Sequence, residues 1–144
     1  MRRSGTWLLV TMVLVAFSAS AALAARCHFT AGGSDVPQCS IRGDVLECTG
    51  GHVAGLGGDA ESVELVVNVA CATKSPKQQQ PPGHATSGPV PLPEEDPTGQ
   101  IALPDFTVDA DCPPGLNATF GTTGTLTFFD AEGSPIGCRL EFAL

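Results

Sequence analysis

Six cysteines carry the clearest chemistry in this chain of 144 residues, and they are Cys27, Cys39, Cys48, Cys71, Cys112 and Cys138. No two of them are spaced as C-x₂-C, the motif of zinc ribbons and of thioredoxin-type redox sites. An even number of thiols in a small chain is typical of a disulfide framework when the protein reaches an oxidising compartment. We therefore expect three disulfides and no free thiol, provided that the chain is exported.

The N-terminal residues predict that export. Arg2 and Arg3 precede an apolar run over residues 7–17, and small residues then lead to Ala22-Leu23-Ala24. This order is typical of a secretory signal peptide, so we predict cleavage of residues 1–24 and a secreted or periplasmic protein. The alternative, an uncleaved membrane anchor, is disfavoured by the small and polar residues that follow the run. No later stretch approaches the roughly 18 apolar residues of a membrane span, so we expect no membrane contact after cleavage.

The spacings of six cysteines allow 15 pairings and do not select one of them. The pair Cys71–Cys112 is expected because each of these cysteines ends a predicted strand, and the bridge would close the base of a long loop. The pair Cys27–Cys39 would hold the N-terminal segment in place. Cys48–Cys138 is then the remaining pair. Each bridge would stabilise the fold by roughly 2–4 kcal/mol in the chain-entropy account.

No catalytic constellation is evident among the other residues. His28, His52 and His84 are not neighbours, and none lies in an H-E-x-x-H motif. A G-x-S-x-G motif is also absent, and oxidised thiols are not nucleophiles. We therefore predict that the protein is not an enzyme and that it has no cofactor.

Four carboxylates are the only candidate metal ligands, and they are Asp109, Asp111, Asp130 and Glu132. Their hard oxygen atoms are the ligands that Ca²⁺ prefers. Asp109 and Asp111 share one face of a predicted strand, but that face is the solvent-exposed one. Solvated carboxylates are the preferred interpretation, so we expect no metal site.

Charge and aromatic content restrict the partners. The formal charge is −8, and removal of Arg2 and Arg3 with the leader would make it −10, which repels nucleic acids. The only Trp, Trp7, lies in the leader, and there is no Tyr, so the aromatic residues that dominate protein interfaces are missing. Asn117-Ala118-Thr119 is a possible glycosylation sequon. A protein partner remains open, and the sequence does not define the oligomeric state.

Apolar and polar residues alternate over several short runs, which predicts an all-β chain. The clearest strand is residues 62–70, where Val63, Leu65, Val67 and Val69 share one face. Residues 106–111 repeat this alternation, and residues 125–129 and 136–142 flank a Gly-containing connection that predicts a hairpin. A second hairpin is predicted between residues 44–48 and 52–56, around the pair Gly50-Gly51. We predict a two-sheet antiparallel β-sandwich of about seven strands within one domain, residues 25–144.

Residues 74–100 differ from the rest because they hold seven of the 12 prolines and show no alternation. Proline removes a donor from a strand ladder, so this segment is predicted to be a loop inserted in the single domain. The alternative is a linker between two domains. It is disfavoured because the parts of the chain on either side are each too small for an ordinary hydrophobic core.

The run of residues 49–58, Thr-Gly-Gly-His-Val-Ala-Gly-Leu-Gly-Gly, is followed by a Val-rich strand that ends at Cys71. This pattern resembles exported bacterial β-sandwich proteins of the Ig-like or prealbumin-like kind. Gln80-Pro81-Pro82-Gly83 and Cys112-Pro113 are similar to positions in uncharacterised secreted proteins of that kind. The resemblance implies a sandwich of about seven strands and no activity, although the chain lacks the core Trp of antibody-type Ig domains.

The expected function is therefore an exported small structural or binding module that is not catalytic. The alternative is a disulfide-stapled inhibitor of an extracellular hydrolase. In that case residues 74–100 would be the presented loop, and Lys74 and Lys77 would offer cationic side chains to a trypsin-like pocket. A hydrolase whose active site is not evident from the sequence is a third and less favoured class.

Overall fold

The computed structural model describes residues 26–73 and 83–144, so the predicted signal peptide lies outside the described residues. Eleven strands and one helical turn, α1 (Thr30–Gly33), make up the described part of the chain. The strands are β1 (His28–Phe29), β2 (Gln38–Arg42), β3 (Val45–Thr49), β4 (His52–Ala54), β5 (Ser62–Ala72), β6 (Gly83–Thr86), β7 (Val90–Pro91), β8 (Gln100–Ala102), β9 (Phe106–Asp109), β10 (Asn117–Phe129) and β11 (Pro135–Ala143). The predicted all-β class is confirmed.

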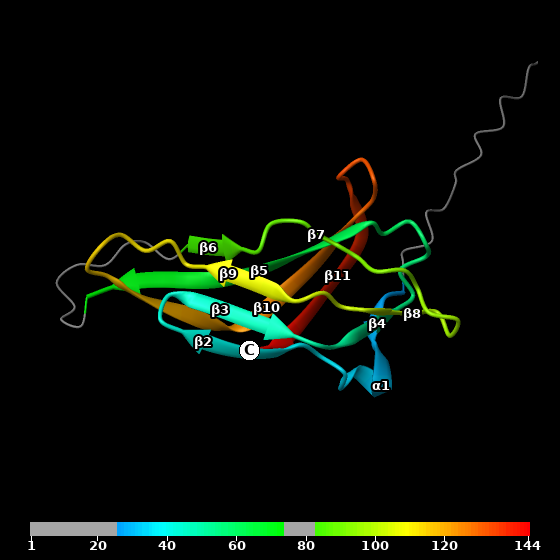
Figure 1. Cartoon of the computed structure of the whole chain (residues 1–144), viewed down its shortest axis with the longest axis horizontal. Helices are drawn as coiled ribbons and strands as arrows, with labels where there is room; N and C mark the ends of the chain where they lie inside the picture. Colours follow the sequence, from blue (N-terminus) through cyan, green and yellow to red (C-terminus); the bar gives the residue numbers. More distant parts are fainter. Residues whose placement is uncertain (1–25, 74–82) are drawn as a thin grey trace, which may run out of the picture.

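The strands form three antiparallel sheets (Figure 1). The largest has the order β11-β10-β5-β6, with β7 also paired to β5, and the two others have the orders β2-β3-β9 and β1-β4-β8. The strand count is therefore eleven in three sheets, where the sequence predicted about seven in two. Four of the additional strands have only two to four residues, which is too short for an alternation of apolar and polar residues to be recognised.

The hydrophobic core lies between the large sheet and the other two. The predicted inner face of β5 is buried, since Val63 and Leu65 have no exposed surface and Val67 is 1% exposed. Leu126 and Phe128 of β10 belong to the same buried cluster. The facing sheets contribute further buried side chains, including Leu46, Val53, Phe106 and Val108. Period-two alternation on the long strands thus places one continuous apolar layer inside.

Three disulfides link the described cysteines, and two of the predicted pairs are wrong. Cys71–Cys112 is present as expected, but the other pairs are Cys27–Cys138 and Cys39–Cys48. The register of a hairpin explains the error: β2 pairs with β3 so that Cys39 lies directly opposite Cys48, with their Cα atoms 4.0 Å apart. Cys27, which precedes β1, therefore bonds to Cys138 of β11.

The Gly50-Gly51 hairpin is also wrong. The strands on either side of this pair form, but β3 pairs with β2 and β9, whereas β4 pairs with β1 and β8. Gly50 and Gly51 do adopt the expected positive φ, and they carry the chain from one sheet into the next. At Gly51 a Cβ atom would lie only 2.9 Å from the backbone nitrogen of Pro37, so the crossing requires glycine. The tight hairpin instead turns at Gly43 and Asp44.

The predicted loop 74–100 contains strands, and this part of the prediction is wrong for residues 83–86, 90–91 and 100. Val67 of β5 pairs with Ala85, and Val63 of β5 pairs with Val90. β6 and β7 are edge strands, because each pairs with β5 alone. Edge strands tolerate proline, since one side of their backbone has no hydrogen-bond partner. Residues 74–82 lie outside the described residues.

Prolines alternate with apolar residues along the segment that contains β7. Val90 is paired with Val63, and the Leu92 backbone N–H donates to the Glu61 carbonyl oxygen at 3.0 Å. The intervening Pro89, Pro91 and Pro93 are exposed, whereas Val90 and Leu92 are half-buried. The prolines therefore occupy the positions whose backbone faces away from β5, where no donor is needed.

No helix in residues 26–73 or 83–144 is long and apolar enough to cross a membrane.

The predicted hairpin near the C-terminus is present, since β10 and β11 pair antiparallel and Phe129 lies opposite Pro135 at the turn.

Candidate functional site

The outer face of the large sheet is polar because it carries the residues that alternate with the buried ones. In register, Thr125 of β10 lies between Val66 of β5 and Glu141 of β11. Asn68 of β5 lies opposite His84 of β6. Four neighbouring strands thus bring side chains that are far apart in the sequence to one face.

A hollow of about 400 Å³ opens on this face. Its lining consists of Val66, Asn68, His84, Thr123, Thr125, Arg139 and Glu141. Six of these seven side chains are polar, and they include hydrogen-bond donors, acceptors and one charge of each sign. Ligand pockets are usually more apolar, so an occupant of this hollow would have to be polar.

A bulge in β10 bends the sheet beside the hollow. Phe120 pairs with Val69 and Gly124 pairs with Val67, so residues 121–123 of β10 stand opposite Asn68 alone. At Gly121 a Cβ atom would lie 3.2 Å from the Asn68 Cβ, so a larger residue would crowd the Asn68 side chain. Bulges bend a strand and redirect its side chains, and they are frequent beside functional sites.

The six polar side chains of the lining make no hydrogen bond to the described part of the protein. They include Asn68, His84, Arg139 and Glu141, none of which is buried. On the same sheet face, by contrast, Thr86 donates its hydroxyl hydrogen to Glu64. The hollow therefore presents uncommitted donors and acceptors from four strands, which leaves them available to a ligand.

The three histidines lie in separate surroundings. His28 Nδ1 is 3.1 Å from the Arg26 carbonyl oxygen, and His84 lines the hollow. His52 Nδ1 is 2.8 Å from Asp35 Oδ2, which also accepts a hydrogen bond from the Thr30 hydroxyl at 2.9 Å. Those two hydrogen bonds, the one from Thr30 first, hold the pKa of Asp35 below its usual range.

The four carboxylates considered as calcium ligands do not converge. Asp109 accepts a hydrogen bond from the Asp111 backbone N–H at 2.9 Å. Asp130 accepts bonds from the backbone N–H groups of Glu132 and Ser134, within the β10–β11 turn. Figure 1 shows that turn well apart from the end of β9. Among residues 26–73 and 83–144, no group of three His, Cys, Asp or Glu side chains could hold a metal ion.

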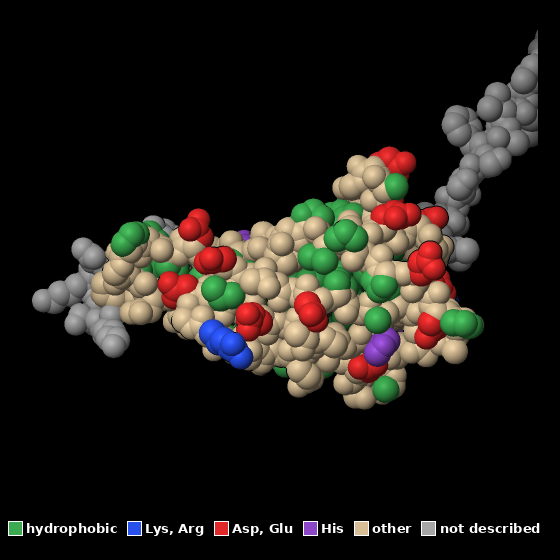
Figure 2. All heavy atoms as spheres, viewed as in Figure 1, with side chains coloured by type: hydrophobic (Ala, Val, Ile, Leu, Met, Phe, Trp, Pro, Cys, Tyr) green, Lys and Arg blue, Asp and Glu red, His purple; other side chains and the backbone are tan. Residues whose placement is uncertain are grey.

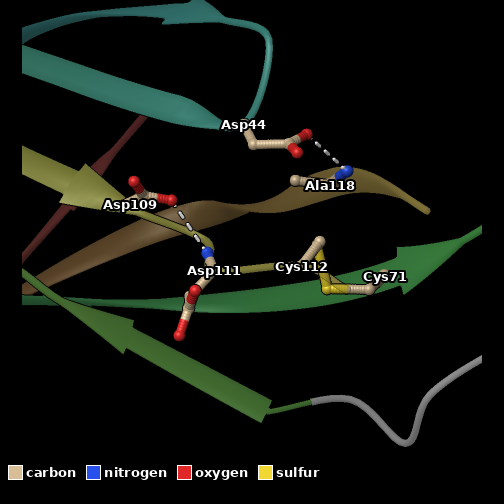
Figure 3. The surroundings of a disulfide bond; sticks show 6 residues. All are labelled: Asp44, Cys71, Asp109, Asp111, Cys112 and Ala118. Carbon is tan, nitrogen blue, oxygen red and sulfur yellow. Dashed lines mark hydrogen bonds between the residues drawn. A yellow bond between two sulfur atoms is a disulfide. The ribbon is translucent and has the colours of Figure 1, made fainter. Parts of the chain in front are cut away.

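The Cys71–Cys112 disulfide lies where two sheets are joined (Figure 3). Beside it Asp44, in the β2–β3 turn, accepts a hydrogen bond from the Ala118 backbone N–H at 3.0 Å. Asp111 has a φ of 49°, which is unusual for a residue with a side chain. Asn117, the possible glycosylation site, is exposed at the start of β10. The disulfide and the Asp44 hydrogen bond hold the sheets together.

Two further hollows are acidic. One of about 450 Å³ and one of about 250 Å³ share Gly58 and Glu61. Their linings contain no Lys or Arg and hold six carboxylates, at Asp59, Glu61, Glu94, Glu95, Asp130 and Glu132. Figure 2 shows Asp and Glu side chains spread over one face of the molecule, with Lys or Arg in one place only.

Comparison with known proteins gives no matching family model, no matching curated protein and no matching solved structure. The polar hollow was not found from the sequence. The alternation over residues 62–70 predicts that Asn68 lies on the outer face, but only the strand order brings His84, Arg139 and Glu141 to the same hollow.

Proposed function

We propose that the protein is an exported, non-catalytic binding module that holds a small polar ligand in the hollow on the outer face of the large sheet. The observation that carries this proposal is the set of uncommitted polar side chains, Asn68, His84, Arg139 and Glu141, around one hollow.

Export is supported by the three disulfides, which form and persist in oxidising compartments. The predicted signal peptide fits the same location. A disulfide-linked framework also suits binding because it fixes the strands, so little conformational freedom is lost when a ligand is ordered.

The experiment is a ligand screen by two-dimensional NMR on ¹⁵N-labelled protein purified in its exported, oxidised form. The compounds are neutral sugars, uronic acids, amino acids and polyamines, each added at millimolar concentration. We expect at least one class to give saturable shifts in the amide resonances of residues 66–68, 84, 123–125 and 139–141.

A matched pair of variants provides the control. Asn68→Ala alters the hollow, whereas Thr107→Ala alters an exposed side chain on β9, in another sheet. The first should weaken the saturable shifts and the second should not. Shifts confined to other surfaces, or no saturable shift with any class, would contradict the proposal.

A second candidate, the hydrolase inhibitor, is favoured by one observation. The predicted loop is anchored on both sides, by the Cys71–Cys112 disulfide and by the pairing of Gly83 with Val69. Lys74 and Lys77 lie outside the described residues. An inhibitor would slow a trypsin-like protease at stoichiometric concentration and lose that effect when both lysines are changed to Gln. Rapid cleavage without inhibition would exclude this candidate.

A further inference from the structure

We propose that the ligand of the polar hollow is a small zwitterion that carries one ammonium and one carboxylate group, as a free amino acid does. This inference rests on the proposed function, because it assigns a ligand class to the same hollow. It follows from the arrangement of the two charged side chains in the lining.

Arg139 and Glu141 lie on the same face of β11, two residues apart. This spacing places their Cα atoms about 6.8 Å apart along the strand. Both side chains are exposed, and neither makes an ion pair within the described residues. Opposite charges at this separation can be bridged by a ligand whose carboxylate meets the guanidinium and whose ammonium meets the carboxylate.

Arg42 and Glu47 are also two nearby residues of opposite charge, but they bond to each other. These two residues lie in the β2–β3 hairpin and form an ion pair, with Arg42 Nε 3.7 Å from Glu47 Oε2. They therefore satisfy each other, whereas Arg139 and Glu141 leave both charges open beside a hollow.

The neutral groups of the lining suit the same ligand. Thr125 lies directly opposite Glu141, and Asn68 lies opposite His84. Hydroxyl and amide groups both donate and accept, so they can bond to either end of a zwitterion. Val66 is the only apolar side chain in the lining, so a large apolar ligand would find little surface to bury.

The overall charge of the protein also favours a zwitterion over an anion. A formal charge of −8 for the whole chain repels anionic ligands at a distance, although Arg139 would attract them at contact. A zwitterion has no net charge and avoids that repulsion. A neutral sugar would avoid it too, but it would leave the guanidinium and the carboxylate without partners of opposite charge.

The test is an NMR titration of the oxidised, exported protein with four probes. These are L-alanine, N-acetyl-L-alanine, which lacks the ammonium, L-alanine amide, which lacks the carboxylate, and methyl glucoside. We expect L-alanine to shift the resonances of the hollow with a dissociation constant of about 1 mM or below. Each blocked form should bind at least tenfold more weakly, because one charge-assisted hydrogen bond is lost.

Variants of exposed side chains complete the test. Arg139→Gln and Glu141→Gln should each weaken L-alanine binding at least tenfold, whereas Arg42→Gln and Glu47→Gln should leave it unchanged. Equal binding of L-alanine and its blocked forms would overturn the inference. Methyl glucoside binding in the hollow without L-alanine binding would also overturn it, but would leave the proposed binding function intact. No binding by any class in the wider screen would contradict both.

Discussion

His52 forms two hydrogen bonds with Asp35, one through its side chain and one through its backbone N–H. The ring Nδ1 lies 2.8 Å from Asp35 Oδ2, and the His52 backbone N–H donates to the Asp35 carbonyl oxygen at 3.2 Å. Because Asp35 follows α1 and His52 begins β4, this contact holds the N-terminal segment against the β1-β4-β8 sheet.

The Asp35 contact predicts a dependence of stability on acidic pH. The Thr30 hydroxyl and the His52 ring lower the pKa of Asp35. A carboxyl group with a lowered pKa stabilises the folded state above its unfolded pKa of about 3.9, and this contribution is lost as pH falls through the lower folded value. We expect the melting temperature of the Asp35→Asn variant to fall less steeply between pH 4 and pH 2 than that of the parent, as measured by circular dichroism.

The control for this prediction is Asp59→Asn, because Asp59 is exposed and makes no hydrogen bond within the described residues. Its acid profile should match that of the parent. The Asp96 carboxyl, whose pKa is lowered by the Thr98 hydroxyl and the Gln100 backbone N–H, should still produce an acid limb in both variants. Identical profiles for Asp35→Asn and the parent would contradict the prediction.

Gly124→Ala should destabilise the fold by about 1–3 kcal/mol, because a buried position would be overfilled. A Cβ atom there would lie 2.9 Å from Phe142 Cζ, and the Phe142 ring already packs edge-on against Phe29. Gly83→Ala is the matched control, since none of the described residues lies within 4 Å of its added Cβ. Urea unfolding would show the difference, and equal midpoints for the two variants would argue against the packing described here.

Asp44→Ala should reduce the free energy of unfolding by about 1–2 kcal/mol. The Asp44 carboxylate accepts the Ala118 backbone N–H at 3.0 Å, and its loss would leave a half-buried donor without a partner. Glu47→Ala, in the same hairpin, removes only an exposed ion pair and should change stability by less than about 1 kcal/mol. If Glu47→Ala had the larger effect in urea unfolding, the role assigned to Asp44 would be wrong.

Removal of a disulfide should destabilise the fold more when the disulfide closes a longer stretch of chain, because the lost loop-closure entropy grows with the logarithm of that length. The sequence separations are 111 for Cys27–Cys138, 41 for Cys71–Cys112 and 9 for Cys39–Cys48. The chain-entropy account gives losses of about 5, 4 and 2.5 kcal/mol for the three double Cys→Ala variants. Thermal unfolding of the three variants would test this order, and a largest loss for the shortest loop would contradict it.

The long strands could be predicted from the sequence because their alternation has a physical cause that needs no partner. Residues 62–70 show it most clearly, and the structure extends the same strand to Ala72. Short strands such as β7 have no such pattern of their own, because the pairing with β5 creates them.

Two of the three disulfide pairs could not be predicted from the sequence, because they depend on the register of the β2–β3 hairpin. Gly43 and Asp44, flanked by two runs of five residues, make the tight turn that places Cys39 opposite Cys48. The sequence predicts the turn at Gly50-Gly51 instead, and a turn at that position gives neither the β2–β3 register nor the Cys39–Cys48 pair. The hollow depends on register in the same way, because Arg139 and Asn68 line the same hollow only after β10 has paired with both β5 and β11.

The alternation of prolines along residues 89–93 has a consequence for the behaviour of many molecules together. An exposed sheet edge normally offers a row of backbone donors to which a strand of another molecule can add, and such addition is the first step of fibrous aggregation. Within and on either side of β7, this edge presents Pro89, Pro91 and Pro93, none of which has an N–H group. A second chain that approached this edge would find acceptors but no donors. In a concentrated solution of this protein, residues 89–93 therefore resist addition of a strand from another molecule.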